Sequence, residues 1–235
     1  MIRCSVVIPT SDRPALVTRV MDALARQDLP PDEYEIIVCD GGERDDTRAV
    51  VEHWRAVNPV PVTYIPAGVS GPTALCNAGA RAARGEVLAF TDDGAIPEPG
   101  WLRHGWLALS EGAADAASGR IDLPAGDDDP TRYGSDPAQL ELPGLAANCF
   151  CSRRAFESVG GFDPDDRRTA GSDGGLFAKL IQRGFDVVHA TDAVVIHPAQ
   201  HRASTRQLLR FGFLAAFGAA LGDALGRIRF RNRFR

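Results

Sequence analysis

The chain has 235 residues, of which 44% are hydrophobic, and its formal net charge at pH 7 is −5. This length is enough for one large domain that folds on its own. The charge is unevenly distributed: the segment from Arg202 onward carries eight arginines and one acidic residue, a charge of +7, whereas the residues before it carry 18 basic and 30 acidic side chains, a charge of −12. An acidic body argues against nucleic acid as a partner.

The first ten residues, MIRCSVVIPT, carry an apolar run that turns at Pro9 and is too short for a secretory signal or a membrane span. We therefore expect a cytoplasmic protein. The cysteines are odd in number and show no paired CxxC spacing, so we interpret them as buried thiols, with a metal site at the Cys-x-Cys pair as the alternative. They are Cys4, Cys39, Cys76, Cys149 and Cys151.

Residues 202–235 form a separate basic segment. Its apolar run, residues 208–226, is too short and too interrupted to span a bilayer, yet it has arginines at both ends. This pattern predicts an amphipathic helix. The helix either lies on the anionic inner face of a membrane, which would make the protein peripheral there, or packs on the body of the chain.

Strand-length apolar runs alternate with helix-period segments through the first half of the chain. This order predicts an α/β fold with a mostly parallel sheet covered by helices on both faces. The second half is less regular, and no linker divides the chain. The expected strands are 4–9, 34–40, 61–66, 86–90, 186–190 and 193–198; the expected helices are 45–57, 72–84, 98–110, 176–182 and one that starts at Pro14. Residues 114–122 and 144–152 are further apolar stretches, and residues 124–136 are a polar loop.

Two adjacent carboxylates, Asp92 and Asp93, come directly after the fourth strand and before a glycine, and Asp40 ends the second strand. Ligands of open α/β sheets bind beyond the carboxyl ends of the strands, so we expect these three side chains to border one cleft. Neighbouring carboxylates repel each other unless a cation or hydrogen-bond donors compensate. A divalent cation is one solution, and an Asp-Gly turn that caps the next helix is the alternative.

Five segments, in register, resemble those of the family 2 glycosyltransferases, which are inverting enzymes of the GT-A fold. The resemblance spans about Ser5 to Pro198. It is carried by SVVIPTSDRP, YEIIVCDGGERDDT, GPTALCNAGARAARGEVLAFTDDGAIPEPGWL, NCFCSRRAFESVGGFD and GSDGGLFAKLIQRGFDVVHATDAVVIHP. It implies one GT-A-like domain over residues 1–201, with a nucleotide-binding half (1–95) and an acceptor and catalytic half (96–201).

The resemblance also implies roles for single residues. It assigns contacts with the nucleotide of the donor to Pro9, Thr10, Asp12, Asp40, Asn77 and Asp92; a divalent metal, Mn²⁺ or Mg²⁺, to Asp92, Asp93 and His197; and the general base to Asp173. From the residues alone, Asp173 could instead cap a helix, and His197 could be a partly buried histidine at a strand end.

These residue types suit the implied reaction. A divalent metal neutralises the charge that develops on a departing nucleoside diphosphate, and one carboxylate can take the proton of the attacking hydroxyl. The partners would be a nucleotide-sugar, UDP-sugar by default, and a glycan, lipid-linked or small-molecule acceptor.

The chain departs from the family pattern at several positions. The third position of the acidic motif, usually an aspartate that binds the metal, is Gly94, and Asp93 would then have to supply the ligand. Serine at position 11 replaces a common aromatic residue near the nucleobase. These changes leave a second hypothesis open, a catalytically degenerate GT-A protein that binds a nucleotide, a glycan or a partner protein without turnover. Rossmann dinucleotide and P-loop sites are excluded because their glycine and lysine motifs are missing.

Overall fold

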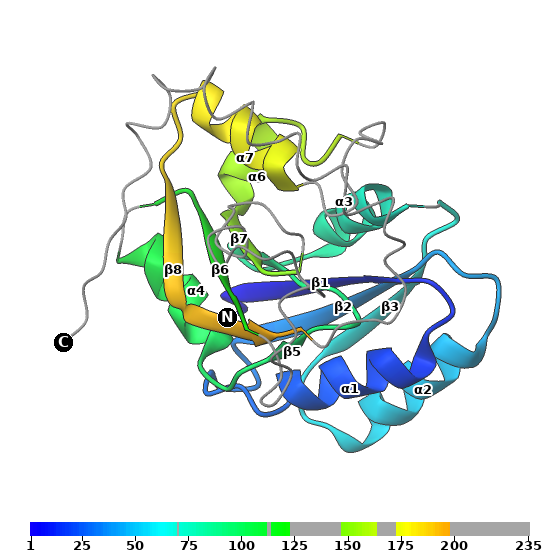
Figure 1. Cartoon of the computed structure of the whole chain (residues 1–235). Coiled ribbons are helices and arrows are strands. Elements are labelled where there is room, and N and C mark those ends of the chain that lie inside the picture. The colour runs from blue at the N-terminus through cyan, green and yellow to red at the C-terminus, as the bar shows by residue number, and fades with distance from the viewer. Residues whose placement is uncertain (70, 112–113, 123–146, 164–172, 198–235) are drawn as a thin grey trace.

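The structure is a computed structural model that describes residues 1–69, 71–111, 114–122, 147–163 and 173–197. The predictions for the polar loop 124–136 and for the basic segment 202–235 lie outside these residues. The elements, in chain order (Figure 1), are β1 (Cys4–Thr10), α1 (Pro14–Leu24), β2 (Tyr34–Asp40), α2 (Asp46–Val57), β3 (Val62–Pro66), α3 (Pro72–Ala82), β4 (Val87–Phe90), β5 (Ile96–Pro97), α4 (Trp101–Ser110), β6 (Ala116–Asp122), β7 (Cys149–Ser152), α6 (Arg153–Ser158), α7 (Asp173–Gln182) and β8 (Val187–Ile196).

The described strands form one eight-stranded sheet in the order β3-β2-β1-β4-β7-β6-β8-β5. Six of them run in the same direction, while β5 and β7 run against their neighbours. The prediction of a mostly parallel sheet is confirmed. The sheet is continuous across the two predicted halves, because β4 of the first half pairs with β7 of the second.

Helices cover both faces of this sheet, as predicted (Figure 1). On one face, α1, α2 and α4 pack against every second side chain of β1, namely Cys4, Val6 and Ile8. On the opposite face, α3, α6 and α7 pack around Val7 and Phe90. The alternation along β1 follows from the two-residue period of a strand, and burial on both faces explains why the run contains no exposed position.

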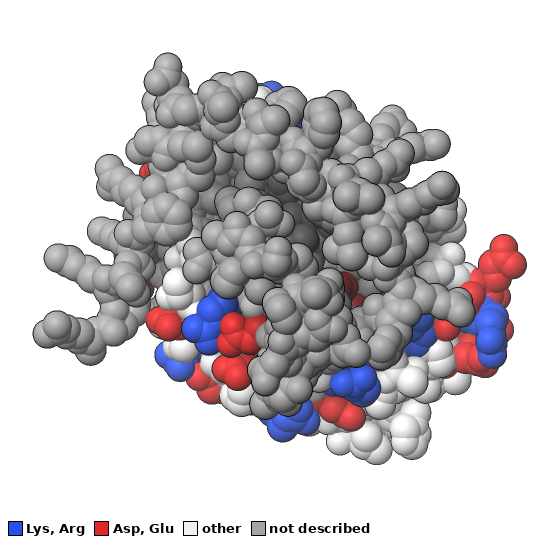
Figure 2. All heavy atoms as spheres, in the orientation of Figure 1, with Lys and Arg blue, Asp and Glu red and all other residues white. Residues whose placement is uncertain are grey.

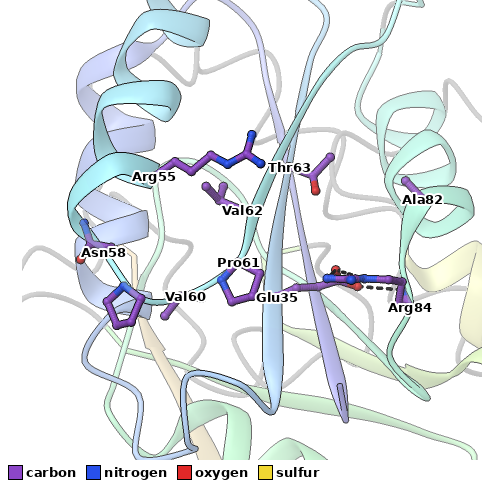
Figure 3. A pocket seen from close by; sticks show the side chains of 10 residues that line it. Glu35, Arg55, Asn58, Val60, Pro61, Val62, Thr63, Ala82 and Arg84 are labelled. Carbon is purple, nitrogen blue, oxygen red and sulfur yellow. Dashed lines mark hydrogen bonds and ion pairs between the residues drawn. The ribbon is translucent and has the colours of Figure 1, made fainter. Parts of the chain in front are cut away.

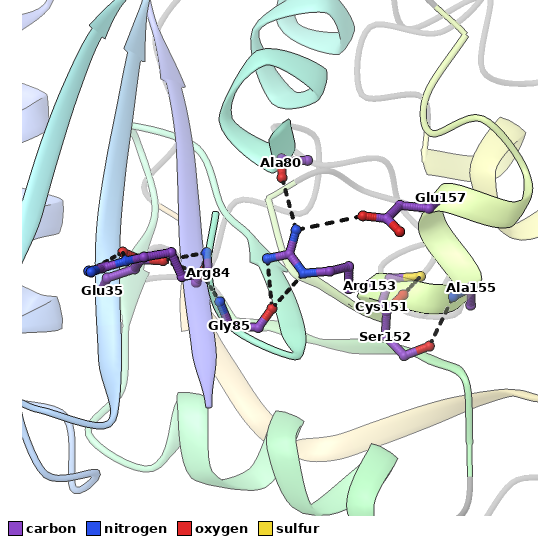
Figure 4. A network of polar contacts seen from close by, with 10 residues as sticks. Glu35, Ala80, Arg84, Gly85, Cys151, Ser152, Arg153, Ala155 and Glu157 are labelled. Carbon is purple, nitrogen blue, oxygen red and sulfur yellow. Dashed lines mark hydrogen bonds and ion pairs between the residues drawn. The ribbon is translucent and has the colours of Figure 1, made fainter. Parts of the chain in front are cut away.

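Several element boundaries differ from the prediction. Helix α3 ends at Ala82 rather than at Arg84, because residue 83 is extended and the Arg84 backbone N–H donates to the buried Glu35 carboxylate at 2.7 Å (Figure 4). Helix α4 begins at Trp101 because residues 96–97 form β5. Two predicted strands in the region 186–198 are one strand, β8, whose pairing with β6 shifts in register between Gly119 and Arg120 and then continues.

Within the part of the chain that the structure describes, no helix is long and apolar enough to cross a membrane. Acidic and basic side chains are interspersed over the described surface in the view of Figure 2. In this view (Figure 2) the described residues therefore form no patch that is only acidic or only basic.

Candidate active site at the carboxyl ends of the strands

The predicted acidic residues meet at one edge of the sheet. Strand β1 ends at Thr10, which pairs in register with Asp40 at the end of β2, and β4 runs beside β1 on its other side. The Thr10 hydroxyl donates to the Asp93 carboxylate at 2.6 Å, which ties the end of β1 to the turn after β4. Asp40 follows β2 and Asp92 and Asp93 follow β4, the two strands that flank β1, so the three carboxylates lie at the same end of the sheet; that they border one cleft stays a prediction.

Asp40 organises the loops around it. Its side chain is buried, and its Oδ1 accepts hydrogen bonds from the backbone N–H groups of Gly42 at 2.9 Å and Asp12 at 3.3 Å. Asp12 in turn has a left-handed backbone, with φ of 53°, and its carboxylate accepts from the N–H groups of Glu43 and Arg44. The loop after β1 and the turn after β2 are therefore clamped to each other through two carboxylates.

Tyr64 is a residue of this site that the sequence analysis missed. It lies on β3, and its hydroxyl donates to Oδ2 of Asp40 at 3.1 Å. Burial raises the pKa of Tyr64 to about 12, and the neighbouring Asp40 carboxylate adds to the rise. The phenol therefore stays protonated and keeps donating. The sequence does show a tyrosine in the strand that follows Asp40 along the chain. Its contact with Asp40 could be found only from the register of β3 against β2.

Asp92 and His197 lie side by side although 105 residues separate them. Strand β5 pairs antiparallel with β8, placing Ile96 opposite Ile196, and this pairing brings the two residues together. The His197 Nε2 and Asp92 Oδ2 atoms are 2.9 Å apart. The other Asp92 oxygen accepts from the backbone N–H of Gly94 at 3.1 Å, which leaves this carboxylate about one-third exposed at the rim.

Asp93 points elsewhere. Its side chain is only 5% exposed; one oxygen accepts from Thr10, and the other accepts from Arg13 Nη1 at 3.2 Å. Burial raises the pKa of Asp93, and the Thr10 hydroxyl and the Arg13 guanidinium oppose that rise. The structure thus separates the three residues predicted to hold a metal: Asp92 and His197 come together, and Asp93 is engaged with the loop after β1.

The donor atoms at this rim fit a divalent metal in part. Among the described residues, no three His, Cys, Asp or Glu side chains gather as a metal site. Asp92 and His197 nevertheless offer one oxygen and one nitrogen, aimed at each other and both partly exposed. Magnesium and related ions commonly use one or two protein ligands and take the rest of their shell from water and substrate phosphates. A site with Asp92 and His197 as its two protein ligands is consistent with this coordination.

The remaining predicted residues have these positions. Pro9 is buried in β1 opposite Cys39. Asn77 lies on α3, where its amide donates to the Phe162 carbonyl and accepts from the Phe162 N–H, both at 2.9 Å, so a contact with the donor stays a prediction. Helix α7 begins at Asp173, while the carboxylate of that residue lies outside the described side chains.

The five cysteines are buried thiols, as predicted. Burial raises the pKa of Cys4 and of Cys39 to about 12 each. Cys149 and Cys151 lie on β7, and the alternative of a metal site there is not supported among the described residues.

A cavity of about 560 Å³ lies at the opposite edge of the sheet, near the amino-terminal ends of β2 and β3 (Figure 3). Its walls include Arg55 from the end of α2, Thr63 from β3, and the ion pair of the buried Glu35 with the exposed Arg84. No residue predicted for the active site contributes to these walls.

Comparison with known proteins identifies the family. The sequence profile described as Glycosyl transferase family 2 matches residues 5–168, which is more than half of the chain. The chain belongs to glycosyl transferase family 2. The predicted resemblance is confirmed, and the matched segment contains the rim residues from β1, β2 and β4 but not His197.

Two relatives align with this chain over only part of their own length. The glycosyltransferase AglE of Haloferax volcanii is 25% identical over 205 residues, covering 83% of this chain and 67% of AglE. Validoxylamine A glucosyltransferase of Streptomyces hygroscopicus subsp. limoneus is 37% identical over 114 residues, which are 48% of this chain and 24% of that protein. This family 2 chain therefore spans about two thirds of the first relative and about a quarter of the second.

Two solved structures share the fold. The mannosyltransferase PcManGT from Pyrobaculum calidifontis, in complex with GDP-Man and Mn²⁺, superposes with a TM-score of 0.74 at 21% identity, covering 94% of this chain and 64% of that one. S. aureus TarS 1–349, in complex with UDP-GlcNAc, gives 0.67 at 16% identity, covering 86% and 60%. The predicted GT-A-like fold of this family 2 member is thereby confirmed.

Proposed function

We propose that the chain transfers a glycosyl group from a nucleoside-diphosphate sugar to an acceptor hydroxyl, with inversion at the anomeric carbon. One observation carries the proposal. In a member of glycosyl transferase family 2, Asp40 and Asp92, which pairs with His197, follow the two parallel strands that flank β1, and the Thr10–Asp93 hydrogen bond joins the end of β1 to the turn that carries Asp92. The names of the similar structures, which include complexes with GDP-Man and UDP-GlcNAc, support a nucleotide-sugar donor.

The clamped loops after β1 and β2 are the proposed nucleoside site. Asp40 is buried and fixed by backbone donors on Oδ1 and by the Tyr64 hydroxyl on Oδ2, so a nucleobase or ribose would use the remaining lone pair of Oδ2 with little rearrangement. Thr10 and Asp12 border the same loop. Pre-formed geometry of this kind favours binding because fewer groups have to be ordered when the ligand arrives.

Asp92 and His197 are the residues that would hold a divalent metal. An oxygen and an imidazole nitrogen form a mixed donor set, which favours a transition ion such as Mn²⁺ over Mg²⁺ with its preference for oxygen. When bound, the metal supplies Lewis-acid neutralisation of the charge on the departing diphosphate. Asp93, whose oxygens are occupied by Thr10 and Arg13, is left out of this set.

Asp173 is the proposed general base. Its position at the first residue of α7 suits an ionised carboxylate, because the amino terminus of a helix stabilises negative charge. Leu176, Phe177 and Leu180 anchor this helix in the core. As the acceptor oxygen bonds to the anomeric carbon, its proton passes to Asp173, and the bond from that carbon to the diphosphate oxygen breaks with its electron pair leaving on the diphosphate. A single displacement of this kind inverts the configuration.

Release of nucleoside diphosphate tests the proposal. The chain is incubated with Mn²⁺, a panel of donors (UDP-Glc, UDP-GlcNAc, GDP-Man) and a panel of sugar and lipid-linked acceptors. We expect release of UDP or GDP and a β-linked product from an α-linked donor by NMR. Asp173→Asn is expected to lose at least about a hundredfold in rate, at the lower end of what a general base contributes. Asp192→Asn, an exposed aspartate of β8, is the control.

Two results would contradict this function. One is nucleotide binding with neither transfer nor hydrolysis across the whole panel, which is the behaviour of the degenerate alternative. The other is wild-type activity in Asp173→Asn.

Attachment of the segment 202–235 to an anionic membrane also stays a proposal that rests on its arginines and apolar run. Flotation with phosphatidylglycerol vesicles tests it, with phosphatidylcholine vesicles as the control.

A further inference from the structure

One arginine stands directly beside the acidic turn of the rim. Arg13 precedes α1, and its guanidinium donates through Nη1 to Asp93 Oδ1 at 3.2 Å. The two partners differ sharply in exposure: the Asp93 side chain is 5% exposed and the Arg13 side chain 50%. A buried carboxylate therefore holds a guanidinium that faces outward at the rim.

This contact uses only a small part of the arginine. A guanidinium has five N–H donors in a planar fork, and the described ion pair occupies one nitrogen. Such a fork binds phosphate oxygens in pairs, and the bonds are strong because both groups are charged. Asp93 therefore holds Arg13 in place through one nitrogen, and the other N–H groups of the guanidinium can bind a phosphate.

The position of Arg13 places it close to the proposed metal site. Asp93, its anchor, directly follows Asp92, and Asp92 contacts His197. Consecutive Cα atoms are only about 3.8 Å apart. Asp92 and Asp93 face different partners, so a diphosphate that lies against Asp92 and extends toward the loop after β1 is the one that would meet the guanidinium.

We propose that Arg13 binds a phosphate of the donor diphosphate, and that Asp93 is a positioning residue that holds Arg13 and Thr10 in place. The inference rests on the proposed function. It gives the second carboxylate of the acidic turn a role other than metal ligation. It also places a positive charge beside a turn whose third position is glycine, where the family usually has a metal-binding aspartate.

Comparing nucleotides with nucleosides tests this role. Binding of UDP and GDP is measured by calorimetry, and binding of uridine and guanosine by ligand-observed NMR, on the full chain with Mn²⁺. We expect Arg13→Gln to weaken the diphosphate that the wild type binds by roughly 10- to 100-fold, as for a lost hydrogen bond to a charged group, while nucleoside affinity stays within about twofold. Arg13→Lys should recover part of the loss. Arg19→Gln, which changes an exposed arginine on α1, is the control.

Asp93→Asn tests the positioning role. It should weaken the diphosphate selectively, and its effect should be much smaller in an Arg13→Gln background, because both changes remove the same contact. Thermal unfolding of each variant shows whether the fold is retained.

The outcomes separate the two proposals. If the wild type binds no nucleoside diphosphate, the proposed function fails. If the wild type binds one and Arg13→Gln binds it equally well, or if Arg13→Gln weakens nucleoside and diphosphate to the same degree, then only the role of Arg13 is overturned, and the ion pair merely locks the loop.

Discussion

Gly42→Ala is expected to damage the proposed nucleoside site with little effect on the rest of the fold. A Cβ atom at position 42 would lie 2.2 Å from Oδ1 of Asp12 and 2.7 Å from its backbone nitrogen. Contacts below 3.0 Å essentially never occur, so Asp12 has to move by about 1 Å. Because Asp12 already has a positive φ, its backbone has little freedom to absorb the shift.

The magnitude follows from the hydrogen bonds of the clamp. Moving Asp12 weakens three bonds, those to Asp40, Glu43 and Arg44. At about 0.5–1.5 kcal/mol each the loss could reach about 4 kcal/mol, but the bonds to Glu43 and Arg44 are exposed, so water replaces them and about 1–2 kcal/mol is expected. For a chain of this size that lowers Tm by about 2–8 °C. A misplacement of about 1 Å at a binding loop weakens nucleotide recognition by at least about tenfold.

Calorimetric titration of UDP and GDP, with thermal unfolding of the same samples, measures both effects. Gly100→Ala is the matched control, since a Cβ there meets only the ends of the His104 and Arg103 side chains. Nucleotide affinity in Gly42→Ala within about twofold of the wild type would refute the argument that the clamp shapes the binding site.

Two substitutions and one reactivity measurement test the packing of the fold. Glu35→Gln should lower the free energy of unfolding by about 1–3 kcal/mol without changing nucleotide affinity, since the buried carboxylate that binds Ser5 and the exposed Arg84 lies at the edge opposite the site. Asn77→Ala should cost about 2 kcal/mol because both hydrogen bonds to Phe162 are lost; urea unfolding measures both variants. All five cysteines should react with Ellman's reagent at pH 8 only after unfolding, because all five are buried, and burial also raises the pKa of Cys4 and Cys39.

Each of these has a contradicting result. If the free energy of unfolding of Glu35→Gln or Asn77→Ala lies within about 0.3 kcal/mol of the wild-type value, the buried contacts make no net contribution to stability. Rapid reaction of any native cysteine would contradict its burial.

The sequence was sufficient to predict that the three aspartates lie at the carboxyl ends of parallel strands. Asp40 and the Asp92–Asp93 pair each follow a predicted parallel strand, and parallel pairing makes the ends of such strands neighbours. Alternating strands and helices were likewise enough for the α/β fold. The antiparallel β7 was not predicted, since the direction of a short apolar run is not encoded in its own residues.

The direction of individual side chains could not be predicted in the same way. Asp92 and Asp93 are adjacent, yet one faces His197 and the other faces Thr10, because the backbone of a short turn decides the orientation. Tyr64 reaches Asp40 only through the register of β3 on β2, which sequence patterning does not determine. Only the family resemblance placed His197 in the site, since it depends on the pairing of β5 with β8.

The effect of Mn²⁺ on nucleotide binding tests the central claim most directly. Calorimetric titration of UDP and GDP is run with Mn²⁺ and with EDTA, on wild type, Asp92→Asn and His197→Ala. We expect Mn²⁺ to tighten the binding of one diphosphate by at least about tenfold in the wild type, and to have much less effect in either variant. Absence of nucleotide binding, or a Mn²⁺ effect that persists undiminished in both variants, would contradict the claim that Asp92 and His197 hold the metal of a nucleotide-sugar site.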